Sequence, residues 1–204
     1  MKKIFLLSGI VLLFATATQA QIRIGIQAGA NVSNQSRSDF NGSKLLSNEA
    51  FKGFHAGVVA DIPLTTNLYL QPQLQYTKKG AKYTAALGTD AKLTMHYVEV
   101  PVNLLYKINV PFGKIYGGAG PVISYGFAGK VANNGQTNKL YSSDKNWNRL
   151  DVSANAVAGV EFNNGFFASV NYQRGFRDIN KSDAVTVKNR SAGLTVGYML
   201  NLSK

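Results

Sequence analysis

The sequence contains no cysteine, two histidines, five prolines, and only 10 acidic residues against 22 lysines and arginines. The absence of cysteine excludes both a disulfide framework and a lipid-modified cysteine at the start of a mature chain. With only His55 and His96 as nitrogen ligands and no thiol, the composition also argues against a structural metal site. We therefore expect neither a bound metal nor a cofactor.

Long apolar runs are also missing, except at the N-terminus. There, two lysines precede an apolar run from Ile4 to about Ala15, followed by Thr18-Gln19-Ala20, the small-x-small form that a signal peptidase accepts. An uncleaved anchor is the alternative, but the run is shorter than the roughly 20 residues that a spanning helix needs. The sequence predicts a cleaved signal peptide at residues 1–20 and one exported domain at 21–204, with no Pro-rich or Ser-rich linker.

What the exported part does contain is apolar–polar alternation with a period of two, which is typical of β-strands. In LYLQPQLQYT, residues 68–77, the large apolar side chains fall on one strand face and the glutamines on the other. The same alternation occurs in seven other segments, at residues 22–32, 53–62, 93–108, 114–128, 150–162, 166–175 and 189–202. The sequence thus predicts eight strands of about ten residues or more.

The predicted connections alternate between short and long. Tight turns lie at 63–67, 109–113 and 163–165, the last with an Asn-Gly hairpin signal, and polar loops lie at about 33–51, 80–92, 129–149 and 176–187. Short turns at one end and long loops at the other are typical of a transmembrane β-barrel, in which the turns are periplasmic and the loops extracellular.

The strand faces distinguish a barrel from a soluble sandwich, which is the alternative. The polar faces consist mainly of Gly, Ser, Asn, Gln and Thr, whereas a solvated sheet face would usually carry Lys and Glu. Aromatic residues gather near the strand ends, at Tyr76, Tyr125, Phe127 and Tyr172 on the loop side and at Tyr106, Phe162, Phe166 and Tyr198 on the turn side. We therefore predict an all-β fold, an eight-stranded antiparallel up-and-down transmembrane β-barrel closed by its first and last strands.

Three segments carry a family resemblance: LYLQPQLQYTKKGAK, YVEVPVNLLYKI and GKIYGGAGPVISYGF. With the signal and the Gly-rich first strand, they make the chain resemble the outer-membrane β-barrel domain family often called "porin family protein", related to PorT-like proteins and distantly to OmpX-like and OmpW-like barrels. The resemblance implies a place in the bacterial outer membrane, contact with its lipid and lipopolysaccharide, and insertion by the barrel-assembly machinery. The last strand fits the assembly signal at Thr195, Gly197, Leu200 and Leu202, although the usual terminal aromatic residue is absent.

Two irregularities interrupt the pattern. Pro72, Pro101 and Pro121 lie inside predicted strands, although proline cannot donate to the ladder. We expect a bulge or a weakened seam between the third and fourth strands, and a functional lateral opening is a further hypothesis. The phase of the apolar residues also slips near Tyr97 and Val98, which predicts a bulge there.

Charged residues on the predicted inner faces form a candidate lumen network: Arg23, His55, Asp61, Glu99, Lys107, Asp151 and Glu161. Arg23 should face Asp61 near the turn end, with Lys107 and Glu161 at a similar depth. Charges in a narrow lumen must be paired or hydrated, so we predict a salt-bridged plug. A gated ion path with Glu99 near its middle is the alternative.

Positive charge dominates the predicted loop side. Without Lys2 and Lys3 the formal net charge falls from +12 to about +10, and most of this excess lies in the last three loops. The densest group is Lys78, Lys79, Lys82 and Lys92, which we predict to contact lipopolysaccharide phosphates or other anions. Solvated loops without a specific partner are the alternative, and nucleic acid is not expected as a partner of an exported barrel.

No catalytic motif emerges. His55, Asp61 and one of the serines could be imagined as a triad, but residues six apart on one strand lie about 20 Å apart. We expect a monomeric protein without enzymatic activity. Three functions are compatible with the sequence: a structural or surface-interaction barrel acting through its loops, a narrow channel for ions or small polar solutes, and a PorT-like component of a secretion or assembly system with partner proteins.

Overall fold

The computed structural model describes residues 22–39, 48–84, 90–133, 136–140, 148–176 and 185–200. Ten strands form one antiparallel sheet. Eight of them are long and two are short: β1 (Arg23–Asp39), β2 (Asn48–Glu49), β3 (Phe51–Pro63), β4 (Leu68–Thr84), β5 (Asp90–Val110), β6 (Gly113–Asn133), β7 (Gln136–Lys139), β8 (Leu150–Phe162), β9 (Phe166–Gly175) and β10 (Val185–Leu200). Among the described residues, no helix is long and apolar enough to cross a membrane.

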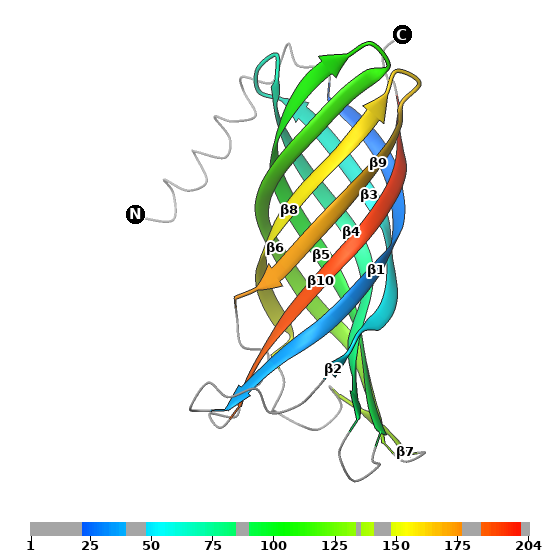
Figure 1. The fold of residues 1–204 in the computed structure, drawn as a ribbon, viewed down its shortest axis with the longest axis vertical. Coiled ribbons are helices and arrows are strands. Elements are labelled where there is room, and N and C mark those ends of the chain that lie inside the picture. The colour runs from blue at the N-terminus through cyan, green and yellow to red at the C-terminus, as the bar shows by residue number, and fades with distance from the viewer. Residues whose placement is uncertain are drawn as a thin grey trace.

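The eight long strands close into a barrel (Figure 1). Each pairs with its neighbours in the chain, and β1 also pairs with β10, from Ile24–Leu200 to Asp39–Val185. Closure gives every long strand two hydrogen-bonded neighbours, which a structure in lipid requires because lipid offers no partner to a free edge. The predicted fold class is confirmed.

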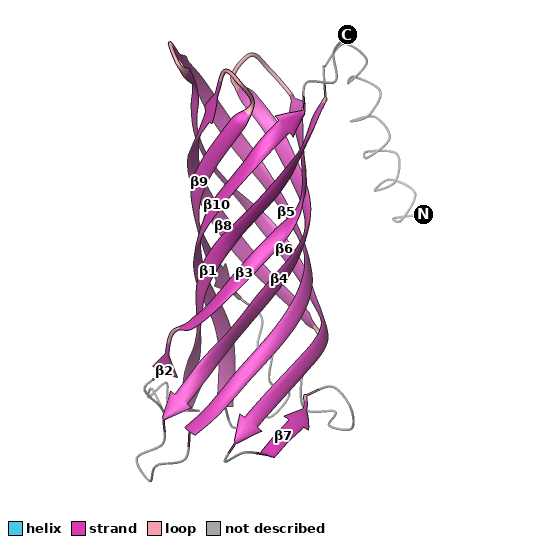
Figure 2. Ribbon diagram, turned by 90° about the vertical axis from the view of Figure 1, so that its right-hand side faces the viewer, coloured by secondary structure: helices cyan, strands magenta, loops and turns pink. Residues whose placement is uncertain are grey.

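The three tight turns lie where the sequence predicts them, at one end of the barrel, which we call the turn end. In the Asn163–Gly165 turn, Gly165 has a φ of 89°, a conformation that a residue with a side chain rarely adopts. The opposite end, which we call the loop end, differs from the prediction because the strands are longer. Most of the residues predicted as the 80–92 loop belong to strands, since β4 and β5 pair as far as Thr84 and Asp90. The hairpins at this end extend well beyond the body of the barrel (Figure 2).

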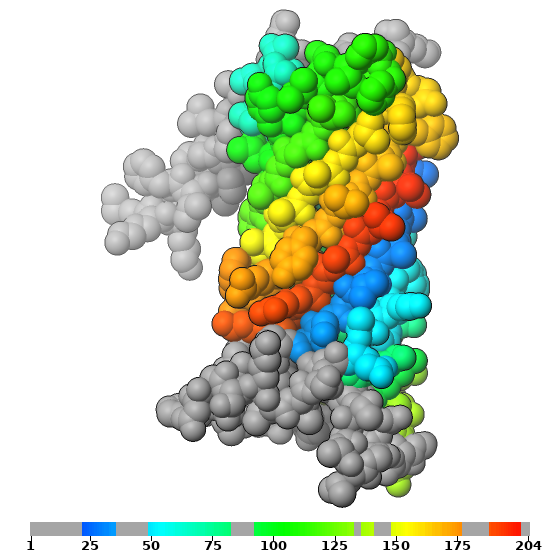
Figure 3. Space-filling model, viewed as in Figure 1, coloured from blue at the N-terminus to red at the C-terminus, as the bar shows by residue number. Residues whose placement is uncertain are grey.

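The apolar faces point outward. Leu194 is 65% exposed and Val196 63%, and among the described residues 26 other large apolar side chains are exposed as well. Figure 3 shows the strands of one side packed as oblique stripes. An exposed apolar surface of this extent is what acyl chains cover. Six of the eight predicted girdle aromatics are among these exposed residues, at both ends: Tyr106, Tyr125, Phe127, Phe162, Phe166 and Tyr172.

The in-strand prolines interrupt the pairing at three successive seams. The β4–β5 seam is the one that the sequence predicts, and the β3–β4 and β5–β6 seams were not predicted. The β3–β4 pairing skips Pro72, passing from Val59–Gln73 to Ile62–Leu70. The β4–β5 pairing skips Pro101 by passing from Pro72–Val102 to Gln75–Glu99. The β5–β6 pairing skips Pro121 in the same way. Each proline lies at the interruption with the preceding strand, because its nitrogen has no hydrogen to donate.

A register shift lies at the predicted place, between His96 and Tyr97 of β5, but the predicted change of phase on that strand is wrong. β5 alternates without a break, and Leu93, Met95 and Tyr97 all point inward and are buried. The extra residue belongs to β6, where Tyr97 pairs with Gly126 and His96 with Ala128, which leaves Phe127 unpaired with β5. We call this the β6 bulge.

The lumen is less polar than the sequence predicts. Near the turn end it contains two apolar clusters, Val59–Phe167–Met199 and Tyr69–Leu105–Tyr116. Gly159 makes room for one of these rings, since a Cβ there would lie 2.6 Å from Tyr116. Near the loop end, Leu93, Met95 and Tyr97 are joined by buried Phe51 and Leu140. Apolar inward residues therefore flank the polar centre on both sides.

Candidate functional site

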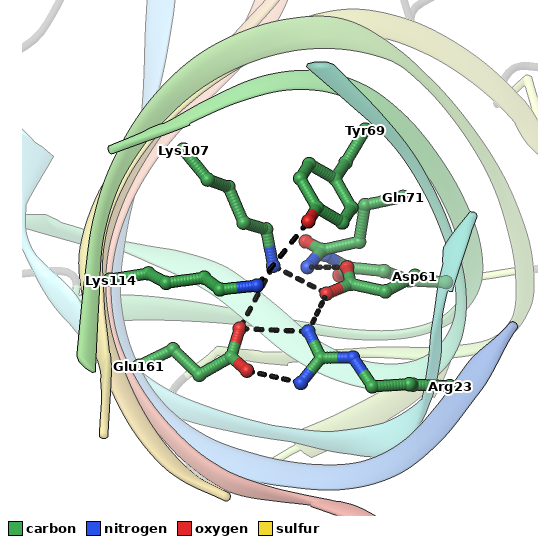
Figure 4. Close-up of polar contacts among 8 residues, drawn as sticks. Arg23, Asp61, Tyr69, Gln71, Lys107, Lys114 and Glu161 are labelled. Atoms are coloured by element: carbon green, nitrogen blue, oxygen red, sulfur yellow. Dashed lines mark hydrogen bonds and ion pairs between the residues drawn. The ribbon is translucent and has the colours of Figure 1, made fainter. Parts of the chain in front are cut away.

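Four charged side chains meet inside the turn end of the barrel, and we call them the turn-end cluster: Arg23, Asp61, Lys107 and Glu161 (Figure 4). Arg23 lies directly opposite Asp61 in the β1–β3 register, and its Nη2 is 2.8 Å from Asp61 Oδ2. Arg23 also pairs with Glu161, and Lys107 pairs with Asp61 and, at 2.9 Å, with Glu161. Two cations and two carboxylates thus neutralise each other, which burial in a narrow lumen requires.

Aromatic rings and a glutamine complete this cluster. The Lys107 ammonium lies 4.8 Å from the ring centroid of Tyr69 and 5.3 Å from that of Tyr116, within the range of cation–π attraction. Gln71 donates to Asp61 at 2.9 Å, and Lys114 reaches the hydroxyl of Tyr69 at 3.3 Å. Figure 4 shows Lys107, Tyr69, Gln71, Asp61 and Lys114 converging from several strands into the centre of the barrel.

A second ion pair, Lys79–Glu99, lies nearer the loop end, with a distance of 2.6 Å. Glu99 also accepts hydrogen bonds from Thr77 and Ser124, each at 2.8 Å, and Lys79 donates to Gln173 at 2.7 Å. We call these five residues the mid-lumen cluster. This corrects the prediction for Lys79, which is 4% exposed and is not a contact of the outer rim. Odd-numbered residues of β4 point inward, so Lys79 follows Gln71, Gln73, Gln75 and Thr77 into the lumen.

A chain of glutamine hydrogen bonds joins the two clusters. The side-chain nitrogen of Gln27 donates to Gln73 at 2.9 Å and to Gln75 at 3.0 Å. On one side, Gln73 donates to Gln71, which donates to Asp61. On the other side, Gln75 donates to Glu99 at 3.1 Å. The polar face of LYLQPQLQYT, together with Gln27, therefore connects one set of buried carboxylates with the other.

The remaining predicted lumen residues, His55 and Asp151, are also buried but lie outside the turn-end cluster. His55 Nε2 is 2.9 Å from the hydroxyl of Thr195, and Asp151 accepts from Asn189 at 2.8 Å. All seven predicted lumen residues therefore point inward, and four of them form the turn-end cluster. His55 and Asp61, the imagined catalytic pair, have different partners and do not meet.

A small cavity lies between these side chains. It is lined by the glutamines, His55, Thr195 and neighbouring residues, and has a volume of about 30 Å³. Asn155 and Asn171 line it, and each has a side-chain oxygen without a protein partner. Such a space suits about two water molecules.

The outer rim is basic, but its composition differs from the prediction. Lys78, Lys82 and Lys92 face outward at the loop end, where Lys82 lies directly opposite Lys92 and 3.9 Å from Glu49. Among the acidic side chains that the structure describes, Glu49 alone faces outward, since the other four are in the lumen. Seven further exposed cations lie at this end: Lys52, Lys130, Lys139, Arg149, Arg174, Lys188 and Arg190. The sequence predicted the positive charge of the loop regions that contain most of them, but did not name them as contacts. For those that lie in strands, the alternation of inward and outward side chains along the strand would have identified them.

No group of three or more His, Asp or Glu residues in the described ranges has an arrangement that could hold a metal ion. The chemistry that this geometry offers is therefore of two kinds: a lumen of paired charges and hydrogen-bonded amides, and an outward surface that changes from apolar to cationic toward the loop end.

Comparison with known proteins places this geometry in a family. The profile described as "Outer membrane protein beta-barrel domain" matches residues 16–181. No curated protein sequence matches the chain. Among solved structures, OprG from Pseudomonas aeruginosa superimposes with a TM-score of 0.51 and 14% identity, covering 89% of this chain and 97% of that one. Ail of Yersinia pestis gives a TM-score of 0.46 and 19% identity, with 88% and 99% covered. Neisserial surface protein A gives 0.48 and 17%, with 86% and 96% covered.

The family match covers most of the chain, and the likeness to OprG supports the same eight-stranded closed fold. In such barrels the short turns are periplasmic and the longer hairpins and loops are extracellular. The predicted signal peptide at 1–20 lies outside the described residues, and the PorT-like relationship stays a prediction. The chain belongs to the outer membrane protein β-barrel domain family and is a small barrel of the bacterial outer membrane.

Proposed function

We propose that this protein acts as a closed barrel, with a structural and surface-interaction role at the outer face of the membrane, and does not conduct solutes. The observation that carries this proposal is the filled lumen. Two ion-pair clusters are joined by Gln27, Gln71, Gln73 and Gln75, and the cavity that these glutamines line has a volume of about 30 Å³. That is room for about two waters and not for a continuous aqueous path.

The charge arrangement of the lumen supports the same conclusion. In the turn-end cluster each carboxylate contacts both cations, and in the mid-lumen cluster Glu99 accepts three hydrogen bonds besides its contact with Gln75. An ion entering the lumen would have to separate these pairs. Separating buried pairs leaves uncompensated charges, which costs several kcal/mol for each pair.

The outer surface offers the chemistry for a surface role. Exposed lysines and arginines surround the loop end of the barrel just beyond the aromatic girdle. In the described ranges, Glu49 is the one acidic side chain that faces outward among them. The phosphates of lipopolysaccharide lie at this level of the outer leaflet. Each Lys or Arg near an anionic lipid surface contributes about 1 kcal/mol to the attraction. We therefore propose lipopolysaccharide as a contact of this basic rim.

Planar-bilayer recording of the refolded mature protein tests the closed barrel, with a known porin recorded in the same bilayer as a positive control. We expect no reproducible single-channel steps from this protein. Reproducible steps that scale with salt concentration would reject the closed barrel and favour the channel. Binding of refolded protein to lipopolysaccharide micelles, compared with dephosphorylated micelles, tests the basic rim, and we expect the phosphorylated form to bind more tightly.

A further inference from the structure

At the β6 bulge, β6 changes its neighbour from β8 to β7. On the turn-end side of the bulge, β6 pairs with β8 as far as Tyr125–Leu150, and Gly126 N donates to Arg149 O at 2.7 Å. On the loop-end side of the bulge, β6 pairs with β7 from Lys130–Lys139 to Asn133–Gln136, and Leu140 N donates to Gly129 O at 2.9 Å. Between these contacts, neither Phe127 nor Ala128 pairs with a described residue on that side of β6, and Phe127 is exposed.

A hollow of about 380 Å³ opens at this point, and we call it the bulge hollow. It is lined by His96, Phe127, Ala128, Gly129, Lys130, Lys139 and Arg149. Three of these seven residues are exposed cations, none is acidic, and two carry rings. The cations come from β6, from β7 and from the start of β8, so the change of neighbour at the bulge is what brings them together.

The bulge hollow lies at the border between the apolar belt and the basic rim. Tyr76, which pairs with Val98, and Tyr125 lie one step nearer the belt, and Lys78 pairs with His96 at the level of the hollow. The rings of Tyr76, His96 and Phe127 lie within 6.2 Å of one another, and the Tyr76 hydroxyl is 2.5 Å from His96 Nδ1. The hollow therefore has an aromatic, membrane-facing side and a cationic, water-facing side.

We propose that the bulge hollow binds a phosphoryl group of a lipopolysaccharide molecule in the outer leaflet. The proposal rests on the proposed function and gives it a defined site. Two ammonium groups and a guanidinium supply charge-assisted donors for a phosphate dianion. The rings of Phe127 and His96 face the region where the sugar and the first methylenes of the same lipid would lie. A free phosphate would use the cations but would leave the aromatic side uncovered.

A matched pair of triple variants tests this site. Lys130→Gln, Lys139→Gln and Arg149→Gln remove the cations of the bulge hollow. Arg174→Gln, Lys188→Gln and Arg190→Gln remove equal charge from exposed cations of β9 and β10, where Arg174 lies opposite Arg190. All six side chains are exposed. Binding of the refolded proteins to rough lipopolysaccharide, to the same material after phosphatase treatment, and to free pyrophosphate is measured at one fixed salt concentration.

Both triple variants lose the general attraction of three cations to the anionic lipid surface. The bulge-hollow variant also loses charge-assisted hydrogen bonds to the phosphoryl group, so we expect it to bind rough lipopolysaccharide about 100-fold more weakly than the matched variant. Phosphatase treatment should remove the difference between them. Equal losses in both variants would overturn the defined site but keep the proposed basic rim. No loss in either variant would overturn both. Competition by pyrophosphate at the affinity of lipopolysaccharide would overturn the lipid as ligand.

The shift in SDS-gel mobility between unheated and boiled samples checks that each variant has refolded. If the bulge-hollow triple variant does not refold, Lys139→Gln alone is compared with Lys188→Gln alone. Both lysines are exposed and lie near strand ends at the loop end of the barrel. A tenfold smaller affinity for Lys139→Gln alone supports the site, and equal affinities overturn it.

Discussion

At the scale of single residues, the chain contains adjacent lysines with opposite environments. Lys79 points into the lumen, where its ammonium pairs with Glu99 and donates to Gln173. Lys78 points outward beside His96 at the start of the basic rim. The two side chains have the same chemistry and differ only in the strand face that they occupy. They therefore serve as matched probes of burial.

We predict that Lys79→Met lowers the free energy of unfolding by about 3 kcal/mol or more, because it leaves Glu99 buried without its cation. Lys78→Met should change it by no more than about 0.5 kcal/mol, as for most surface substitutions. Urea unfolding in lipid vesicles measures both. Adding Glu99→Gln to Lys79→Met should recover part of the loss, because no unpaired charge then remains. Equal effects of the two single substitutions would contradict the assignment of Lys79 to the lumen.

At the scale of elements, the proline interruptions make one side of the barrel different from the other. The seams β3–β4, β4–β5 and β5–β6 each lack ladder contacts next to Pro72, Pro101 or Pro121. The β1–β10 seam, in contrast, pairs at every position from Ile24 to Asp39. A missing backbone hydrogen bond lowers the free energy needed to open the strands locally. Amide hydrogen exchange should therefore be faster at the interrupted seams than at the β1–β10 seam.

We predict faster deuterium uptake in peptides covering 71–75 and 100–104 than in peptides covering 26–30 and 194–198, which lie in the continuous seam. Pro101→Val restores a donor in β5 and should slow uptake around 71–75. Pro121→Val should act around 102–104 and leave 71–75 unchanged. Uniform protection in the unmodified barrel, or the same response to both substitutions, would count against the interrupted seams.

At the scale of the whole molecule, the fold is inverted relative to a soluble protein, with apolar side chains outside and polar ones within. Leu194 illustrates this arrangement. It is 65% exposed, and it pairs with Val170, which lies between Tyr172 and Phe166 on β9 and hence near the middle of the apolar belt. Ala192 points the same way but pairs with Tyr172 at the girdle. Depth in the bilayer is the main difference between the two positions.

We predict that Leu194→Arg lowers the free energy of unfolding in vesicles by about 2–4 kcal/mol, since a charge on the lipid face costs most near the bilayer midplane. Ala192→Arg, at the interface, should cost only about 0–1 kcal/mol. Urea titration in lipid vesicles compares the two. If both substitutions were neutral, the outward face would not be embedded in acyl chains, and the inside-out arrangement would be wrong.

Much of this organisation follows from the sequence alone. A period of two determines which side chains share a face, so the inward positions of Arg23, Asp61, Lys107 and Glu161 could be assigned without coordinates. Lys79 was misassigned even though its parity is that of Gln75 and Thr77, because its proximity to Lys78 and Lys82 indicated a basic loop. The strand ends at the loop end were also misplaced, since ladder pairing continues where side-chain alternation is no longer clear.

The sequence by itself determined the eight strands, most of their inward and outward faces, the positions of the turns and the excess of positive charge. Only the tertiary structure decided which inward groups meet, because Gln27, Gln75 and Glu99 come from different strands whose relative stagger is set by barrel closure. It also decided that the bulge belongs to β6 and that Lys130, Lys139 and Arg149 share one hollow. Local periodicity fixes the direction in which a side chain points, whereas contact between distant strands depends on register, which no single strand encodes.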